Sequence, residues 1–82
     1  MKNAYKGYAL FSDIEDTSLR NRNRAVVLTN LAADHTKERK INHKGVALIL
    51  GYFNEIPAED REDVKKRFQT NMEAKGYVLA RS

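Results

Sequence analysis

The stretch His43–Phe68, HKGVALILGYFNEIPAEDREDVKKRF, decides the fold, because it holds two helical patterns separated by a proline. In the first pattern apolar side chains recur at i, i+3, i+4 and i+7, the spacing that places them on one face of a helix. The residues in this pattern are Val46, Ile49, Leu50 and Phe53. We therefore predict a helix over residues 43–55.

The predicted helix 43–55 is apolar on nearly all of its sides, because Leu48, Tyr52 and Ile56 add apolar surface on a neighbouring side. A helix that is hydrophobic all round is typical of a buried position, so we expect it to form the core, with Ile49, Leu50 and Phe53 buried. A β-strand is the alternative for the short run GVALIL, since short apolar runs fit both structures. The helical spacing continues through GYFNEI, which favours the helix.

Pro57 begins a second helical pattern, which we predict to span residues 57–75. Proline suits the first position of a helix, where its missing N–H costs nothing. Acidic residues come early in this segment and basic residues late, an order that complements the helix dipole. Gly76 is typical of the residue that ends a helix. Three apolar residues spaced by four should face the core: Val64, Phe68 and Met72.

Upstream of these two segments, we predict a helix over residues 17–36. Asp16, Thr17 and Ser18 are all residue types that cap helix N-termini. The expected apolar face of this helix is interrupted by two asparagines and consists of Leu19, Val26, Val27 and Leu31. The polar, basic segment KERKINHKG that follows is expected to be a connecting loop. The sequence thus predicts a mainly α, compact three-helix domain over residues 1–82.

Similar pentapeptides occur near the two ends of the chain, one in an arm over residues 1–16 and one at the start of a tail over residues 76–82. KGYAL occupies Lys6–Leu10 and KGYVL occupies Lys75–Leu79. Because the termini of a compact domain often lie close together, these segments could pair as a two-stranded ribbon. Separate packing of two coincidentally similar segments is nearly as well supported, whereas a duplicated binding site is poorly supported.

Composition excludes several classes of function. The chain has no cysteine, so it can form neither a disulfide nor a zinc–thiolate site. Its apolar runs are too short for a signal peptide or a membrane span, and we expect a cytoplasmic protein without membrane contact. A domain of 82 residues buries a modest share of its surface, so homo-oligomerisation would add stability.

No constellation of residues predicts catalysis, a cofactor or a metal. The glycines are scattered rather than gathered in a phosphate-binding loop. His35 and His43 are too few to hold a metal, which needs three or more ligands. The acidic residues Asp13, Glu15 and Asp16 could bind Mg²⁺, although ordinary helix-start chemistry already explains them. We therefore expect a non-enzymatic protein.

Two binding functions remain, and the sequence favours the first. The first is a small accessory or regulatory module that binds a protein partner through aromatic residues. The candidate contact residues for a protein are Tyr5, Tyr8, Tyr52 and Tyr77. The second is nonspecific nucleic-acid binding by basic residues of the helix over residues 17–36 and of the following loop. If this helix is antiparallel to the helix over residues 43–55, these residues lie at opposite ends of it, so one continuous basic patch does not follow. The candidate phosphate contacts are Arg20, Arg24, Lys37, Arg39, Lys40 and Lys44.

Overall fold

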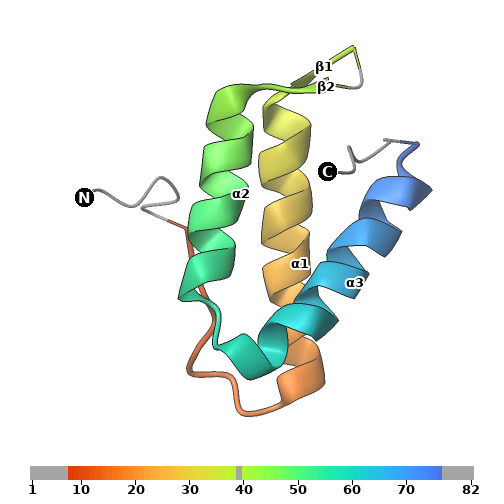
Figure 1. Ribbon diagram of the computed structural model, residues 1–82. Coiled ribbons are helices and arrows are strands. Elements are labelled where there is room, and N and C mark those ends of the chain that lie inside the picture. The colour runs from red at the N-terminus through yellow and green to blue at the C-terminus, as the bar shows by residue number, and fades with distance from the viewer. Residues whose placement is uncertain (1–7, 39, 77–82) are drawn as a thin grey trace.

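The computed structural model describes residues 8–38 and 40–76, and its main elements are three helices (Figure 1). α1 spans Thr17–Asp34, α2 spans His43–Glu55 and α3 spans Ala58–Ala74. The predicted mainly α, three-helix fold is confirmed. The predicted bounds of α2 are correct, whereas α1 ends two residues before its predicted end and α3 is one residue shorter at each end.

The helix ends follow local chemistry. The carboxylate of Asp16 accepts a hydrogen bond from the backbone N–H of Leu19 at 3.2 Å, which makes it the N-cap of α1. Pro57 lies one position earlier than predicted and is the N-cap of α3. Gly76 has a φ of +84°, and its N–H donates to the carbonyl of Glu73 at 3.0 Å. A glycine can adopt this left-handed conformation without strain, so it ends α3 as predicted.

Part of the polar connection after α1 is a short antiparallel hairpin rather than an irregular loop. β1, Thr36–Lys37, pairs with β2, Lys40–Ile41, with Thr36 opposite Ile41. Glu38, in the turn, has a φ of +53°. The sequence prediction of a plain loop was wrong here, because two-residue strands are too short to show the alternating pattern that identifies a strand.

Gly45 fixes the hairpin against the start of α2. Its N–H donates to the side-chain oxygen of Asn42 at 2.8 Å, which caps α2. A Cβ at position 45 would lie 2.6 Å from Cβ of His35 and 2.7 Å from Cγ1 of Ile41. The absence of a side chain at this buried position therefore allows α2 to begin directly beneath the hairpin and the end of α1.

α1, not α2, is the centre of the domain. It packs against both other helices, and Figure 1 shows α2 antiparallel to it on one side and α3 crossing it obliquely on the other. α1 contributes four of the ten buried apolar residues, whereas α2 contributes only two. The buried apolar residues are Ala25, Leu28, Leu31, Ala32, Leu48, Tyr52, Ile56, Val64, Phe68 and Met72. The predicted stripe of α3 is confirmed, and the expectation that α2 forms the core was wrong.

The predicted inward face of α2 was also wrong. Leu48, Tyr52 and Ile56 face the core, whereas Leu50 is 56% exposed and Ile49 is only partly buried. The physical reason is that apolar residues surround most of this helix, so its periodicity cannot show which side meets α1. One side must remain at the surface once the other has packed.

The predicted buried face of α1 was wrong in the opposite sense, because polar residues occupy part of it. Asn21, Arg24 and Thr29 are buried, whereas Leu19 and Val26, expected in the core, are exposed. The hydroxyl of Thr29 donates to the carbonyl of Ala25, and the two other residues have partners outside α1. These polar groups can be buried because each is hydrogen-bonded.

The segment that precedes α1 is held to the helices through its backbone carbonyls. The carbonyl of Leu10 accepts from Nε of Arg24 at 2.7 Å, and that of Ile14 accepts from Nη1 of Arg20 at 2.9 Å. The Tyr52 hydroxyl donates to the carbonyl of Ala9 at 2.6 Å. The predicted ribbon between the two terminal pentapeptides involves residues 6, 7 and 77–79, which lie outside the described residues.

In the described part of the chain, each helix is too short or too polar to cross a lipid bilayer.

Candidate interaction surfaces

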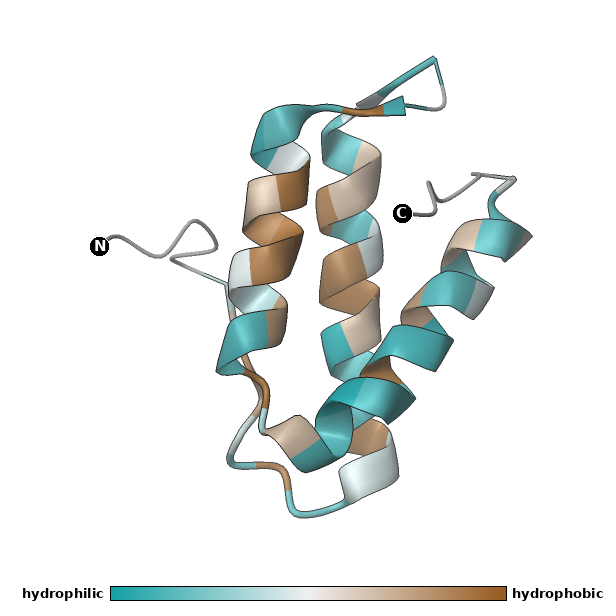
Figure 2. Cartoon of the chain, in the orientation of Figure 1, coloured by the Kyte–Doolittle hydropathy of each residue, from teal (hydrophilic) through white to brown (hydrophobic). Residues whose placement is uncertain are grey.

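The first candidate site is an apolar surface on α2, which we call the α2 apolar face and define as Val46, Ile49, Leu50 and Phe53. Leu50 is 56% exposed and Val46, one turn earlier, is 40% exposed. Ile49 and Phe53 pack partly against the core and link the exposed pair to it. Figure 2 shows hydrophobic residues along much of α2. Exposed apolar side chains that adjoin one another differ from the single ones found on most surfaces.

One end of the α2 apolar face is anchored to α3. The ring of Phe53 meets that of Phe68 edge to face, with centroids 6.4 Å apart. Arg61 of α3 also donates from Nε to the carbonyls of Phe53 and Ile56, at 3.0 and 2.9 Å. These contacts fix the C-terminal end of α2, so the exposed Leu50 projects from a rigid helix rather than from a loop.

The charges around the α2 apolar face are unequal at its two ends. His43 and Lys44 occupy the first turn of α2, and the exposed Lys37 and Lys40 lie in the adjoining hairpin. Glu55, the last residue of α2, is the single acidic side chain in this helix. The hairpin end of the face is therefore cationic.

The tyrosines predicted to contact a protein do not form one surface. Tyr52 is 0% exposed and its hydroxyl binds the carbonyl of Ala9, so its assignment as a contact residue was wrong. Its ring fills the core, where burial of a large aromatic side chain stabilises the fold. Tyr8 is 41% exposed. Tyr5 and Tyr77 lie outside the described residues.

The cationic residues predicted to contact phosphate are divided by the fold. Arg24 is 1% exposed, and its Nη1 donates to Oδ2 of Asp60 at 3.2 Å and to Oδ1 of Asn21 at 3.1 Å. Arg20 reaches the same Asp60 oxygen at 3.1 Å. The assignment of Arg24 to a ligand was wrong, because it is a buried structural residue whose donors are used within the fold.

Three other predicted phosphate contacts lie at the opposite end of α1 from Arg20. Lys37, Lys40 and Lys44 are exposed around the hairpin, and Arg39 lies outside the described residues. Because α1 and α2 are antiparallel, the hairpin and Arg20 are separated by the length of α1 (Figure 1). The structure therefore does not bring together the five predicted cationic residues that it describes.

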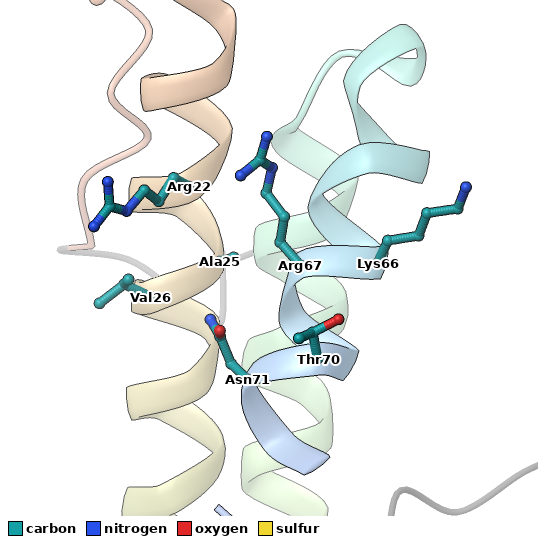
Figure 3. Close-up of a pocket in the computed structure, with 7 residues that line it drawn as sticks. All are labelled: Arg22, Ala25, Val26, Lys66, Arg67, Thr70 and Asn71. Atoms are coloured by element: carbon teal, nitrogen blue, oxygen red, sulfur yellow. The ribbon is translucent and has the colours of Figure 1, made fainter. Parts of the chain in front are cut away.

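The second candidate site is a groove between α1 and α3, which sequence reasoning missed. This α1–α3 groove has a volume of about 490 Å³. Three of its lining residues are cationic, two are polar and two are apolar; together they are Arg22, Ala25, Val26, Lys66, Arg67, Thr70 and Asn71 (Figure 3). None of these lining residues, all of them described, is acidic. The basic run Lys65–Arg67 was visible in the sequence, but only the packing of α3 on α1 brings Arg22 to the same groove.

One cation of the groove, Arg67, is held in place by neighbouring side chains. Its Nε donates to Oδ2 of Asp63 at 2.9 Å, and its Nη2 donates to the hydroxyl of Ser18 at 3.2 Å. Asp63 also accepts from Nδ2 of Asn21 at 3.1 Å. The hydrogen bond from Arg67 is the main cause that lowers the pKa of Asp63, and that from Asn21 adds to it while burial opposes both.

Metal binding finds no support in the parts of the chain that are described. Residues 8–38 and 40–76 contain no group of three or more histidine, cysteine or acidic side chains placed to share a metal ion. Within the acidic segment considered for Mg²⁺, Asp16 uses a carboxylate oxygen to cap α1.

Comparison with known proteins leaves these surfaces as the basis for inferring function, because no family model, no curated protein and no solved structure matches the chain.

Proposed function

We propose that this protein is a small non-enzymatic interaction module that binds a protein partner through the α2 apolar face. The observation that carries the proposal is the exposure of Leu50, at 56%, beside Val46, at 40%. Exposed apolar surface on a rigid element gains free energy when a partner covers it, by about 25 cal/mol for each Å² removed from water. A few well-packed residues near the centre of an interface commonly carry most of its binding energy.

The charges beside the face support a particular class of partner, an apolar segment with acidic residues next to it. His43 and Lys44 lie in the first turn of α2 beside the exposed lysines of the hairpin. An acidic group of the partner placed near this end would be attracted to Lys44 and to the lysines of the hairpin, which adds orientation and association rate more than affinity. At the opposite end of α2, the carboxylate of Glu55 would repel a second acidic group of the partner.

The test compares two exposed leucines on different helices. Leu50→Asp changes the α2 apolar face, and Leu19→Asp makes the same chemical change on α1, where Leu19 is 43% exposed. Tagged parent protein and both variants are used to capture partners from the native cell after nuclease treatment. The captured protein is then purified, and its affinity for each variant is measured by titration calorimetry. We expect Leu19→Asp to bind like the parent and Leu50→Asp to bind at least tenfold more weakly.

Two results would contradict the proposal. Equal affinity of the two variants for the purified partner would show that the α2 apolar face is not the contact. Sedimentation of the parent as a dimer that Leu50→Asp converts to a monomer would show that a second copy of this chain covers the face. Circular dichroism of both variants establishes that they remain folded.

A further inference from the structure

The α1–α3 groove carries a second inference, which does not depend on the α2 apolar face. We propose that this groove binds the phosphodiester backbone of a nucleic acid without reading its sequence. The site differs from the one expected from the sequence, because its cations are Arg22, Lys66 and Arg67 rather than those of the hairpin. α2 contributes no residue to the described lining of the groove, so each surface can be tested alone.

Arg67 is preorganised for an anion. A guanidinium group carries five N–H donors. The bonds to Asp63 and Ser18 use two of them, one on Nε and one on Nη2. Three donors therefore remain without a partner among the described residues. Because the two existing bonds fix the plane of the group, little further side-chain entropy is lost when an anion binds to it.

Arg22 and Lys66 supply the two outer charges of the groove. Both are exposed, and neither forms a hydrogen bond or an ion pair with another described residue. Figure 3 shows Arg22 on α1 and Lys66 on α3 extending in different directions, with Arg67 between them. The three side chains therefore do not converge on one point.

The divergence of these side chains selects the class of ligand. A single small phosphate or carboxylate could not meet all three cations at once. An extended polyanion could, because its charges repeat along its length. The small, buried side chain of Ala25 leaves room for a backbone to approach, and the hydroxyl of Thr70 adds a group that can bind a phosphate oxygen.

A first pair of variants introduces one negative charge inside or outside the groove. Thr70→Glu places it in the lining, and Gln69→Glu places it on the adjacent exposed residue, which does not line the groove. The probe is a short fluorescein-labelled single-stranded DNA, followed by fluorescence anisotropy. Both variants have the same net charge, so long-range repulsion is matched. We expect Thr70→Glu to weaken binding severalfold more than Gln69→Glu does.

A second pair of variants removes two cations from either site. The groove variant is Arg22→Ala with Lys66→Ala, and the matched hairpin variant is Lys37→Ala with Lys40→Ala. Each contact between a cation and a phosphate of single-stranded DNA contributes about −0.7 to the slope of log K against log salt concentration. The slope of the groove variant should therefore be shallower by about 1.4, and the variant should bind on the order of tenfold more weakly at 0.1 M salt. The hairpin variant should keep a slope close to that of the parent.

Three results would overturn the proposal. The first is a parent protein that does not bind the DNA even at low salt. The second is an equal loss in the groove and hairpin variants, which would indicate attraction by net charge alone. The third is a loss confined to the hairpin variant, which would place the contact at Lys37 and Lys40. None of these results bears on the α2 apolar face, and failure of that face would leave the DNA measurements unchanged.

Discussion

Arg24 and Asp60 form a buried ion pair that joins the middle of α1 to the first turn of α3, with Nη1 of Arg24 3.2 Å from Oδ2 of Asp60. The same oxygen also accepts from Nη2 of Arg20 at 3.1 Å. One carboxylate therefore connects two turns of α1 to α3. The two arginines also bind carbonyls of the preceding segment, so this cluster holds three parts of the chain together.

Replacement of the carboxylate in this cluster should be strongly destabilising. Asp60→Ala leaves the guanidinium of Arg24 buried without its charged partner, a change that typically costs about 3–5 kcal/mol. The control is Glu62→Ala, which removes an exposed carboxylate of the same helix that forms no hydrogen bond or ion pair with a described residue, and it should change the free energy of unfolding by about 0.5 kcal/mol or less. Urea unfolding followed by circular dichroism measures both. Equal losses would show that the Arg24–Asp60 pair has no special role.

Truncation of leucines should separate the core from the α2 apolar face. Leu28 of α1 is 0% exposed, and Leu28→Ala should cost about 2–5 kcal/mol because it leaves a cavity. Leu50→Ala, at the surface, should change the free energy of unfolding by about 0.5 kcal/mol or less. Thermal unfolding of the two variants provides the comparison. A larger loss at Leu50 than at Leu28 would contradict the central position of α1.

Addition of one methyl group at Gly45 should disturb the junction of the hairpin and α2. The Cβ of Gly45→Ala would meet His35 and Ile41 at distances shorter than real contacts, and such overpacking typically costs about 1–3 kcal/mol. A loss of 1 kcal/mol lowers the Tm of a domain of this size by roughly 4–8 °C. The control is Ala47→Gly, which deletes a methyl group at an exposed position of α2 and should cost about 1 kcal/mol through helix propensity alone.

The ion pair between Asp63 and Arg67 predicts a specific acid sensitivity. The pKa of Asp63 is lowered in the folded protein, chiefly by its hydrogen bond to Arg67. Its contribution is therefore present above the pKa of the unfolded state, about 3.9, and is lost as the pH falls through the lower folded value. Asp63→Asn should destabilise the protein near pH 6 and lose less stability than the parent on acidification below about pH 4. Unfolding curves at both pH values measure the difference, and parallel losses in the two proteins would exclude this contribution.

The sequence predicted the helices well because their boundaries depend on neighbouring residues. Asp16 and Gly76 act within one turn of the helices that they begin and end, and the stripe that contains Phe68 has apolar residues on one side only. Which side of α2 is buried could not be predicted from neighbouring residues. Leu48 and Leu50 are equally apolar, and only contact with α1 determines which of them is buried.

The sites were harder to predict because they depend on contacts distant in sequence. Arg24 looks like a surface cation until Asp60, 36 residues later, is placed beside it. The α1–α3 groove likewise needs Arg22 and Arg67 on different helices to become neighbours. Among the predicted phosphate contacts, Lys37 and Lys40 of the hairpin are exposed, whereas Arg24 of α1 is buried.

The attachment of the segment before α1 has a consequence for mutational tolerance. The backbone carbonyls of residues 14, 10 and 9 accept hydrogen bonds from the side chains of Arg20, Arg24 and Tyr52, respectively. A backbone carbonyl is present in every amino acid. These three hydrogen bonds therefore depend on the identity of the donor side chains and not on the side chains of residues 9, 10 and 14. In a saturation mutagenesis experiment, exposed positions of the segment such as Ala9 should accept other side chains while the path of the segment across the helices stays the same, whereas Leu10, which packs partly against the core, should accept fewer.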